Sequence, residues 1–96
     1  MNAKEEIKAL NEKGIFDVQE VMQGMRLKVK FNGQVGRESI VYVAKKLKRI
    51  TIEFAPYPLW KKGFWVSLNA TSLNLLNEVS DALINKNEKI EEWWQN

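Results

Sequence analysis

The hydrophobic pattern at the start of the chain predicts a short amphipathic helix. Asn2 is suited to be its N-cap, and Glu5 follows three residues later, as in a capping box. Ile7 and Leu10 give the segment a narrow apolar stripe, and Gly14 is the residue type that commonly ends helices.

Residues 15–24 are compatible with either a helix or a strand. Asp17 and Glu20 resemble a second capping box, and Gly24 would end a short helix. Three β-branched residues equally allow a strand: Ile15, Val18 and Val21.

From Met25 onward the hydrophobic period becomes two, which predicts strands. In the first strand, Met25, Leu27, Val29 and Phe31 alternate with Arg26, Lys28 and Lys30, so one face is apolar and the other basic. Asn32-Gly33, extended by Gly36, indicates a hairpin turn. Further strands are expected at Ser39 to Lys45, Arg49 to Ala55 and Phe64 to Leu68, with Pro56 and Pro58 forcing a loop between the last two.

The end of the chain predicts a helix that Asn69 or Thr71 would cap. Its apolar residues recur at helical spacing: Leu73, Leu76, Val79, Leu83, Ile90 and Trp94. The polar stretch from Asn85 to Glu88 interrupts this pattern, so the helix is expected either to break or to become exposed there. The expected fold is one α+β domain over residues 1–96. It comprises an N-terminal helical extension (1–24), a four-stranded antiparallel meander sheet (25–69) and a C-terminal helix (70–96) covering one sheet face.

The amino-acid composition limits the kinds of catalytic and metal-binding site that the protein can form. The chain has no cysteine and no histidine, which removes thiol nucleophiles, thiolate metal sites, the commonest general base and the commonest zinc ligand. Its carboxylates have the pattern of solvated charges, so we expect a non-catalytic protein without cofactor or metal. No apolar run approaches the ~20 residues of a membrane span, and charged residues follow the first methionine closely. A cytoplasmic location is expected.

Charge is segregated along the chain. Residues 26–62 hold ten Lys and Arg against two Glu, a net charge of +8, whereas residues 1–25 carry −2 and residues 63–96 carry −3. A basic middle between acidic ends suggests a polyanion partner. The alternative is that the middle is simply solvated or pairs with the acidic helices of the protein itself.

Two groups of residues are candidates for contacting nucleic acid. Arg26, Lys28 and Lys30 project at intervals of roughly 6.5–7 Å along one strand face, a spacing that can follow a phosphate backbone. The alternative is an edge strand that lysines protect from aggregation. The loop from Tyr57 to Gly63 combines the aromatic Tyr57 and Trp60 with Lys61 and Lys62; its rings could stack bases or fold back over the core.

Trp65 falls on the sheet face opposite Phe64 and Val66, where no core is expected. We therefore favour an interface there, with a ligand or a partner.

The middle and end of the chain also resemble a known family. The resemblance rests on the segments Ile40-Val-Tyr-Val-Ala44, Arg49-Ile-Thr-Ile-Glu-Phe54, Lys61-Lys-Gly63, Val66-Ser-Leu68 and the leucine-rich helix. Over residues 25–90 this pattern is similar to the positive-cofactor-four transcriptional coactivators and their single-stranded DNA-binding relatives. The resemblance implies a four-stranded curved sheet followed by one helix, pairing of these helices into a dimer, a basic and aromatic channel for melted DNA, and backbone contacts by Lys61 and Lys62.

The function expected from the sequence is single-stranded nucleic-acid binding by a homodimer. The residues expected to neutralise phosphate are Arg26, Lys28, Lys30, Lys45, Lys46, Lys48, Lys61 and Lys62, and those expected to stack bases are Tyr57, Trp60 and Trp65. Leu75, Ile84 and Trp93 lie off the main helical stripe or beside it, and are expected to form the dimer interface. The alternative is a small regulatory or inhibitor protein, of phage or mobile-element type, that binds another protein through its sheet face or its C-terminal helix.

Overall fold

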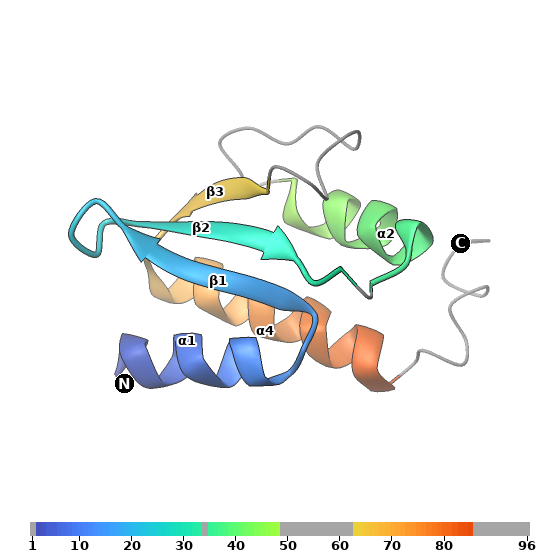
Figure 1. The fold of residues 1–96 in the computed structure, drawn as a ribbon, viewed down its shortest axis with the longest axis horizontal. Helices are drawn as coiled ribbons and strands as arrows, with labels where there is room; N and C mark the ends of the chain where they lie inside the picture. The colour runs from blue at the N-terminus through green and yellow to red at the C-terminus, as the bar shows by residue number, and fades with distance from the viewer. Residues whose placement is uncertain (1, 34, 49–62, 86–96) are drawn as a thin grey trace.

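The computed structural model describes residues 2–33, 35–48 and 63–85 (Figure 1). Along the chain these residues form α1 (Ala3–Glu12), β1 (Phe16–Val21), β2 (Arg26–Phe31), α2 (Arg37–Leu47), β3 (Phe64–Ser67) and α4 (Ala70–Asn85).

The first helix confirms the prediction from its cap and its stripe. The Asn2 side chain accepts a hydrogen bond from the backbone N–H of Lys4 at 3.0 Å, and Ile7 and Leu10 are buried. The helix ends just before Gly14, whose φ of +82° lies in the left-handed region that glycine adopts without steric cost.

Within residues 15–24, the segment left open between helix and strand, Phe16–Val21 form the strand β1 and residues 22–24 belong to the turn that follows it. The strand runs antiparallel to β2, in register from the pair Phe16 and Phe31 to the pair Val21 and Arg26. Phe16 and Val18 are buried. The strand is favoured because this alternation places both side chains on the core side of the sheet.

The predicted strand from Ser39 to Lys45 is wrong, because these residues belong to the helix α2. The buried apolar residues of α2 lie at helical spacing, so a helix brings all of them to one face: Ile40, Val43, Ala44 and Leu47. The β-branched residues in this run favour a strand locally, but burial of that stripe decides the structure. Asn32-Gly33 consequently leads from β2 into a helix and not into a hairpin partner.

The sheet formed by the described residues has three strands in the order β1-β2-β3, all antiparallel. The strand expected over Phe64–Leu68 is confirmed as β3, which pairs with β2. The strand expected over Arg49–Ala55 lies outside the described residues. Between β2 and β3 the described chain forms α2 where a meander strand was expected.

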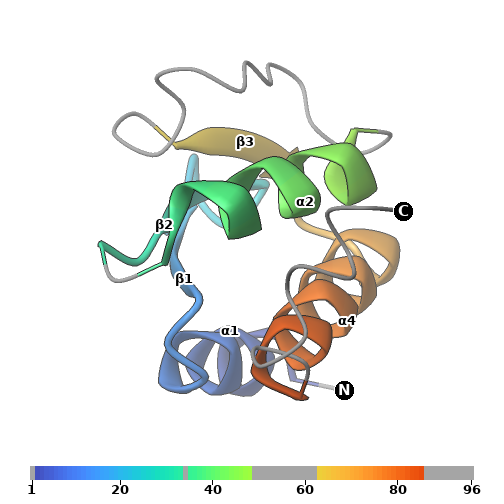
Figure 2. The same cartoon turned by 90° about the vertical axis from the view of Figure 1, so that its right-hand side faces the viewer.

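The helices α1, α2 and α4 pack on one side of the sheet, which curls around them (Figure 2). One core unites their buried side chains with those that alternate along the strands. Three rings at its centre come from three different strands: Phe16, Phe31 and Phe64, with centroids 5.4–6.3 Å apart. Alternate residues of the same strands therefore point to the opposite side, away from the helices.

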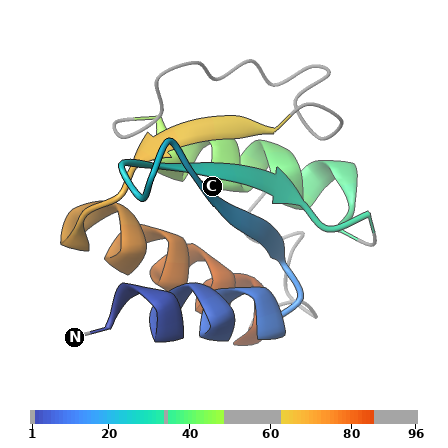
Figure 3. The same ribbon diagram turned by 60° about the vertical axis from the view of Figure 1, so that its left-hand side comes forward.

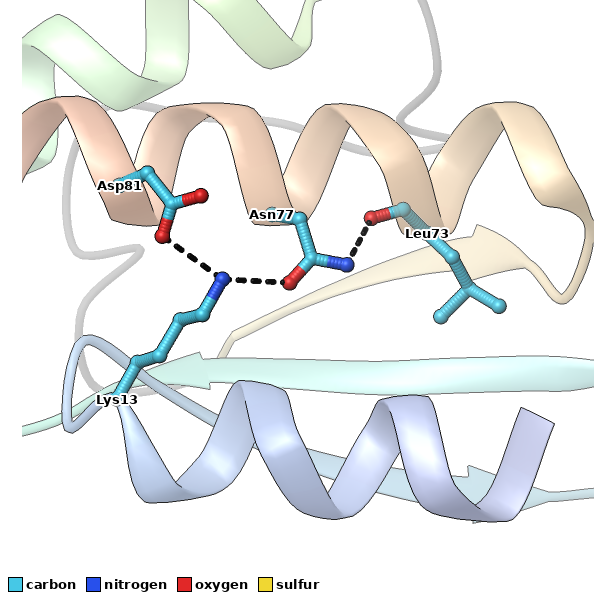
Figure 4. A network of polar contacts seen from close by, with 4 residues as sticks. All are labelled: Lys13, Leu73, Asn77 and Asp81. Carbon is cyan, nitrogen blue, oxygen red and sulfur yellow. Dashed lines mark hydrogen bonds and ion pairs between the residues drawn. The ribbon is translucent and has the colours of Figure 1, made fainter. Parts of the chain in front are cut away.

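Helices α1 and α4 lie side by side beneath the sheet (Figure 3). A polar network joins them: Lys13 Nζ lies 2.8 Å from Asp81 Oδ1 and donates to Asn77 Oδ1 at 2.9 Å (Figure 4). Asn77 in turn donates to the backbone oxygen of Leu73 at 3.1 Å. This network ties the end of α1 to the middle of α4 and supports the helical layer behind the sheet.

Candidate functional site

The sheet surface that points away from the helices carries a distinct set of side chains, and we call it the outer face. Its residues are Asp17, Gln19 and Val21 on β1, Arg26, Lys28 and Lys30 on β2, and Trp65 and Ser67 on β3. The strand registers align them in rows across the sheet: Gln19, Lys28 and Trp65 form one row, and Val21, Arg26 and Ser67 the next. The prediction that Arg26, Lys28 and Lys30 share one face of a strand is confirmed.

Trp65 lies close to two of these cations. The guanidinium carbon of Arg26 is 4.9 Å from the centroid of the indole ring, and the ammonium nitrogen of Lys28 is 5.7 Å from it. All three side chains are half-buried. Cation–π attraction of about 0.5–1 kcal/mol per contact at an exposed site helps to hold the ring over β2.

An open hollow of about 410 Å³ adjoins this cluster. It is lined by Asn11, Asp17, Val18, Gln19, Lys28 and Lys30, so Lys28 contributes both to the hollow and to the surroundings of Trp65. The hollow is open to solvent, and five of its six lining residues are polar or charged.

Asn11 lines the hollow and forms hydrogen bonds with the backbone of the edge strand β1. From α1 its side chain accepts a hydrogen bond from the backbone N–H of Val18 at 2.6 Å and donates to the Val18 carbonyl at 3.1 Å. The Asn11 amide thus occupies the position where a neighbouring strand would pair with β1, and it provides hydrogen-bond partners for both the N–H and the carbonyl of Val18. Sequence reasoning missed this residue, because nothing near Asn11 in the chain indicates a partner on β1.

Three predicted phosphate contacts lie elsewhere in the fold. Lys45 and Lys46 are in the last turn of α2 and Lys48 follows it, on the helical side of the sheet. Lys46 Nζ lies 5.6 Å from the ring centroid of Tyr42. The structure therefore separates these lysines from the outer face. The loop candidates Tyr57, Trp60, Lys61 and Lys62 lie outside the described residues.

The residues expected at a dimer interface have different surroundings. Leu75 is partly buried and packs against the core, whereas the side chain of Ile84 is 44% exposed. Trp93 lies outside the described residues. Because Leu75 already packs against the core, α4 exposes less apolar surface than its sequence suggests. The homodimer stays a prediction.

The described residues contain no group of three or more acidic, histidine or cysteine side chains that could hold a metal ion. Within this part of the chain, no helix has both the length and the apolar character needed to cross a membrane.

The chain matches no protein-family model, no curated protein and no solved structure in the comparisons made with it. The resemblance to the positive-cofactor-four coactivators therefore stays a prediction from the sequence.

Proposed function

We propose that the protein binds single-stranded nucleic acid, without catalysis, on the outer face of its sheet. One observation carries the proposal: the ring of Trp65 on β3 lies beside the cationic groups of Arg26 and Lys28, two of the three basic residues that follow one another along the outer face of β2. An aromatic ring beside cations offers the two contacts that a nucleotide needs, one for the base and one for the phosphate.

The electrostatics of the outer face support this proposal. It carries three cations and, among its residues, the single carboxylate of Asp17. Lys30 is exposed and Lys28 is half-buried, so their ammonium groups can approach phosphate without large desolvation. Alternate residues of a strand are roughly 6.5–7 Å apart, which allows successive cations to follow successive phosphates.

The test is titration of a fluorescently labelled single-stranded oligonucleotide, with anisotropy as the readout, between 50 and 200 mM salt. Each phosphate contact contributes roughly −0.7 to the slope of log affinity against log salt. Exchanging both Lys28 and Lys30 for glutamine should weaken binding and flatten the slope by about 1.4. The matched control exchanges Lys4 and Lys8 for glutamine, because both are exposed on α1, on the other side of the sheet.

Trp65→Ala should lower the affinity roughly 5- to 150-fold, because stacking on an aromatic side chain contributes about 1–3 kcal/mol per base. Its salt slope should stay near that of the parent, since stacking releases no counterions. The proposal is wrong if the parent binds no oligonucleotide at 50 mM salt, or if the α1 control loses as much affinity as the exchange on β2.

A protein partner is the second candidate, and the β1–β2 turn favours it. Met22 and Met25 expose 60% and 72% of their surface there, next to Arg26. Methionine is enriched at adaptable protein interfaces. Exchanging Met25 for glutamine should weaken capture of a specific protein partner, and under the nucleic-acid proposal it should leave oligonucleotide affinity unchanged.

A further inference from the structure

The hollow that shares Lys28 with the surroundings of Trp65 places a carboxylate on a surface that is otherwise basic. Asp17 and Gln19 line it from β1, and Lys28 and Lys30 line it from β2. A carboxylate repels a polyanion, so Asp17 lowers general affinity for nucleic acid wherever phosphate passes close to it.

No ion pair occupies the Asp17 carboxylate in the described part of the chain. Asp17 lies directly opposite Lys30 in the register, the position from which a cross-strand ion pair would form. Within the described part of the chain, however, no ion pair joins the two side chains, and Asp17 is exposed. Its two carboxylate oxygens are therefore available to accept hydrogen bonds from a ligand.

The hollow is also within reach of a base stacked on Trp65. Gln19, Lys28 and Trp65 form one row across three strands, so the backbone of Gln19 is two strand spacings, roughly 10 Å, from that of Trp65. A base over the indole and Lys28 would extend its polar edge toward β1, where the hollow begins.

We propose that this hollow selects guanine, an inference that rests on the proposed binding of single-stranded nucleic acid. The Watson–Crick edge of guanine presents two adjacent donors, N1–H and the 2-amino group, which match the two acceptor oxygens of Asp17. Its O6 can accept from the amide of Gln19 or the ammonium of Lys28. Adenine and cytosine each present one donor beside a ring acceptor, and thymine places carbonyl oxygens on both sides of its single donor. All three would therefore set an acceptor against the carboxylate.

The test uses oligothymidine strands that carry one central guanine or one central hypoxanthine, which lacks only the 2-amino group. The parent should bind the guanine strand at least about fivefold more tightly, because one charge-assisted hydrogen bond distinguishes the two. Asp17→Asn should reduce this ratio to near one while binding oligothymidine as well as the parent or better. Its melting temperature should match that of the parent.

Glu20→Gln is the matched control, because it removes the same charge from the same strand. Glu20 is exposed and pairs in register with the buried Leu27, so it alternates away from the hollow. In this variant, the ratio of affinity for the guanine strand to affinity for the hypoxanthine strand should equal that of the parent.

A parent that binds oligothymidine but does not distinguish guanine from hypoxanthine would overturn the selection of guanine and leave the proposed function standing. A guanine preference that survives in Asp17→Asn would overturn the role of the hollow. A parent that binds none of the strands would instead refute the proposed function itself.

Discussion

Replacing Gly63 with alanine tests how closely β3 must approach β2. Gly63 immediately precedes β3 and has a φ of +79°, in the left-handed region. A Cβ at this position would lie 2.5 Å from the backbone oxygen of Val29 and 2.9 Å from Cγ of Lys30. The first of these atoms is fixed in the centre of the sheet, so alanine is both conformationally strained and sterically blocked.

The two costs can be separated. A left-handed conformation costs a non-glycine residue about 1–2 kcal/mol, and overpacking that shifts the backbone adds about 1–3 kcal/mol. Gly63→Ala should therefore lower the free energy of unfolding by about 2–5 kcal/mol, and the melting temperature by at least about 8 °C. Gly14→Ala is the matched control, because Gly14 has a φ of +82° and a Cβ there would meet no atom of the described residues within 4 Å beyond its chain neighbours. It should lose only the conformational part.

Urea unfolding followed by far-ultraviolet circular dichroism measures both variants. Equal losses in Gly63→Ala and Gly14→Ala would refute the reasoning, because the close approach to β2 would then have no energetic weight. A second readout is oligonucleotide affinity. Any shift of β3 against β2 separates Trp65 from Lys28, so folded Gly63→Ala should also bind more weakly than folded Gly14→Ala.

Three further substitutions test the surroundings of the site. Asn11→Ala should cost about 1–3 kcal/mol and speed hydrogen exchange at the Val18 amide, because both backbone groups of Val18 lose their partner; an unchanged exchange rate would contradict this. Ser80→Ala should leave stability unchanged or raise it slightly, since the fully buried Ser80 hydroxyl has no hydrogen-bond partner among the described residues. A loss above about 1 kcal/mol would refute that. Lys13→Met should cost at most about 1 kcal/mol, because the side chain of Asp81 is 55% exposed, and the loss should shrink at high salt in a denaturation series.

The sequence by itself determined the elements whose signals are local. Asn2 caps α1 as expected, and Asn69, one of the two expected caps of α4, accepts a hydrogen bond from the backbone N–H of Ser72 at 2.8 Å. The alternation along β2 likewise predicted its apolar and basic faces, because strand geometry sends successive side chains to opposite sides. It placed Trp65 opposite the core for the same reason.

Only the tertiary structure decided between helix and strand where both patterns were present. Residues 15–24 carry capping residues and β-branched residues together, and pairing with β2 makes Phe16–Val21 within them a strand. The run from Ile40 to Ala44 carries strand-forming residues at helical spacing, and burial of Ile40, Val43 and Ala44 on one face makes it a helix. In both cases local propensity contributes less free energy than burial against residues distant in the chain.

The candidate site likewise has one part that the sequence predicts and one part that depends on the tertiary structure. The alignment of Arg26, Lys28 and Lys30 along one face of β2 could be predicted from that segment alone, because alternate residues of any strand point to the same side. The ring of Trp65 beside that row, and the hollow that joins Asp17 to Lys28, depend on strand registers that pair segments far apart in the chain. Register is set by which side chains the core buries, and that is a property of the packed molecule and not of any one segment.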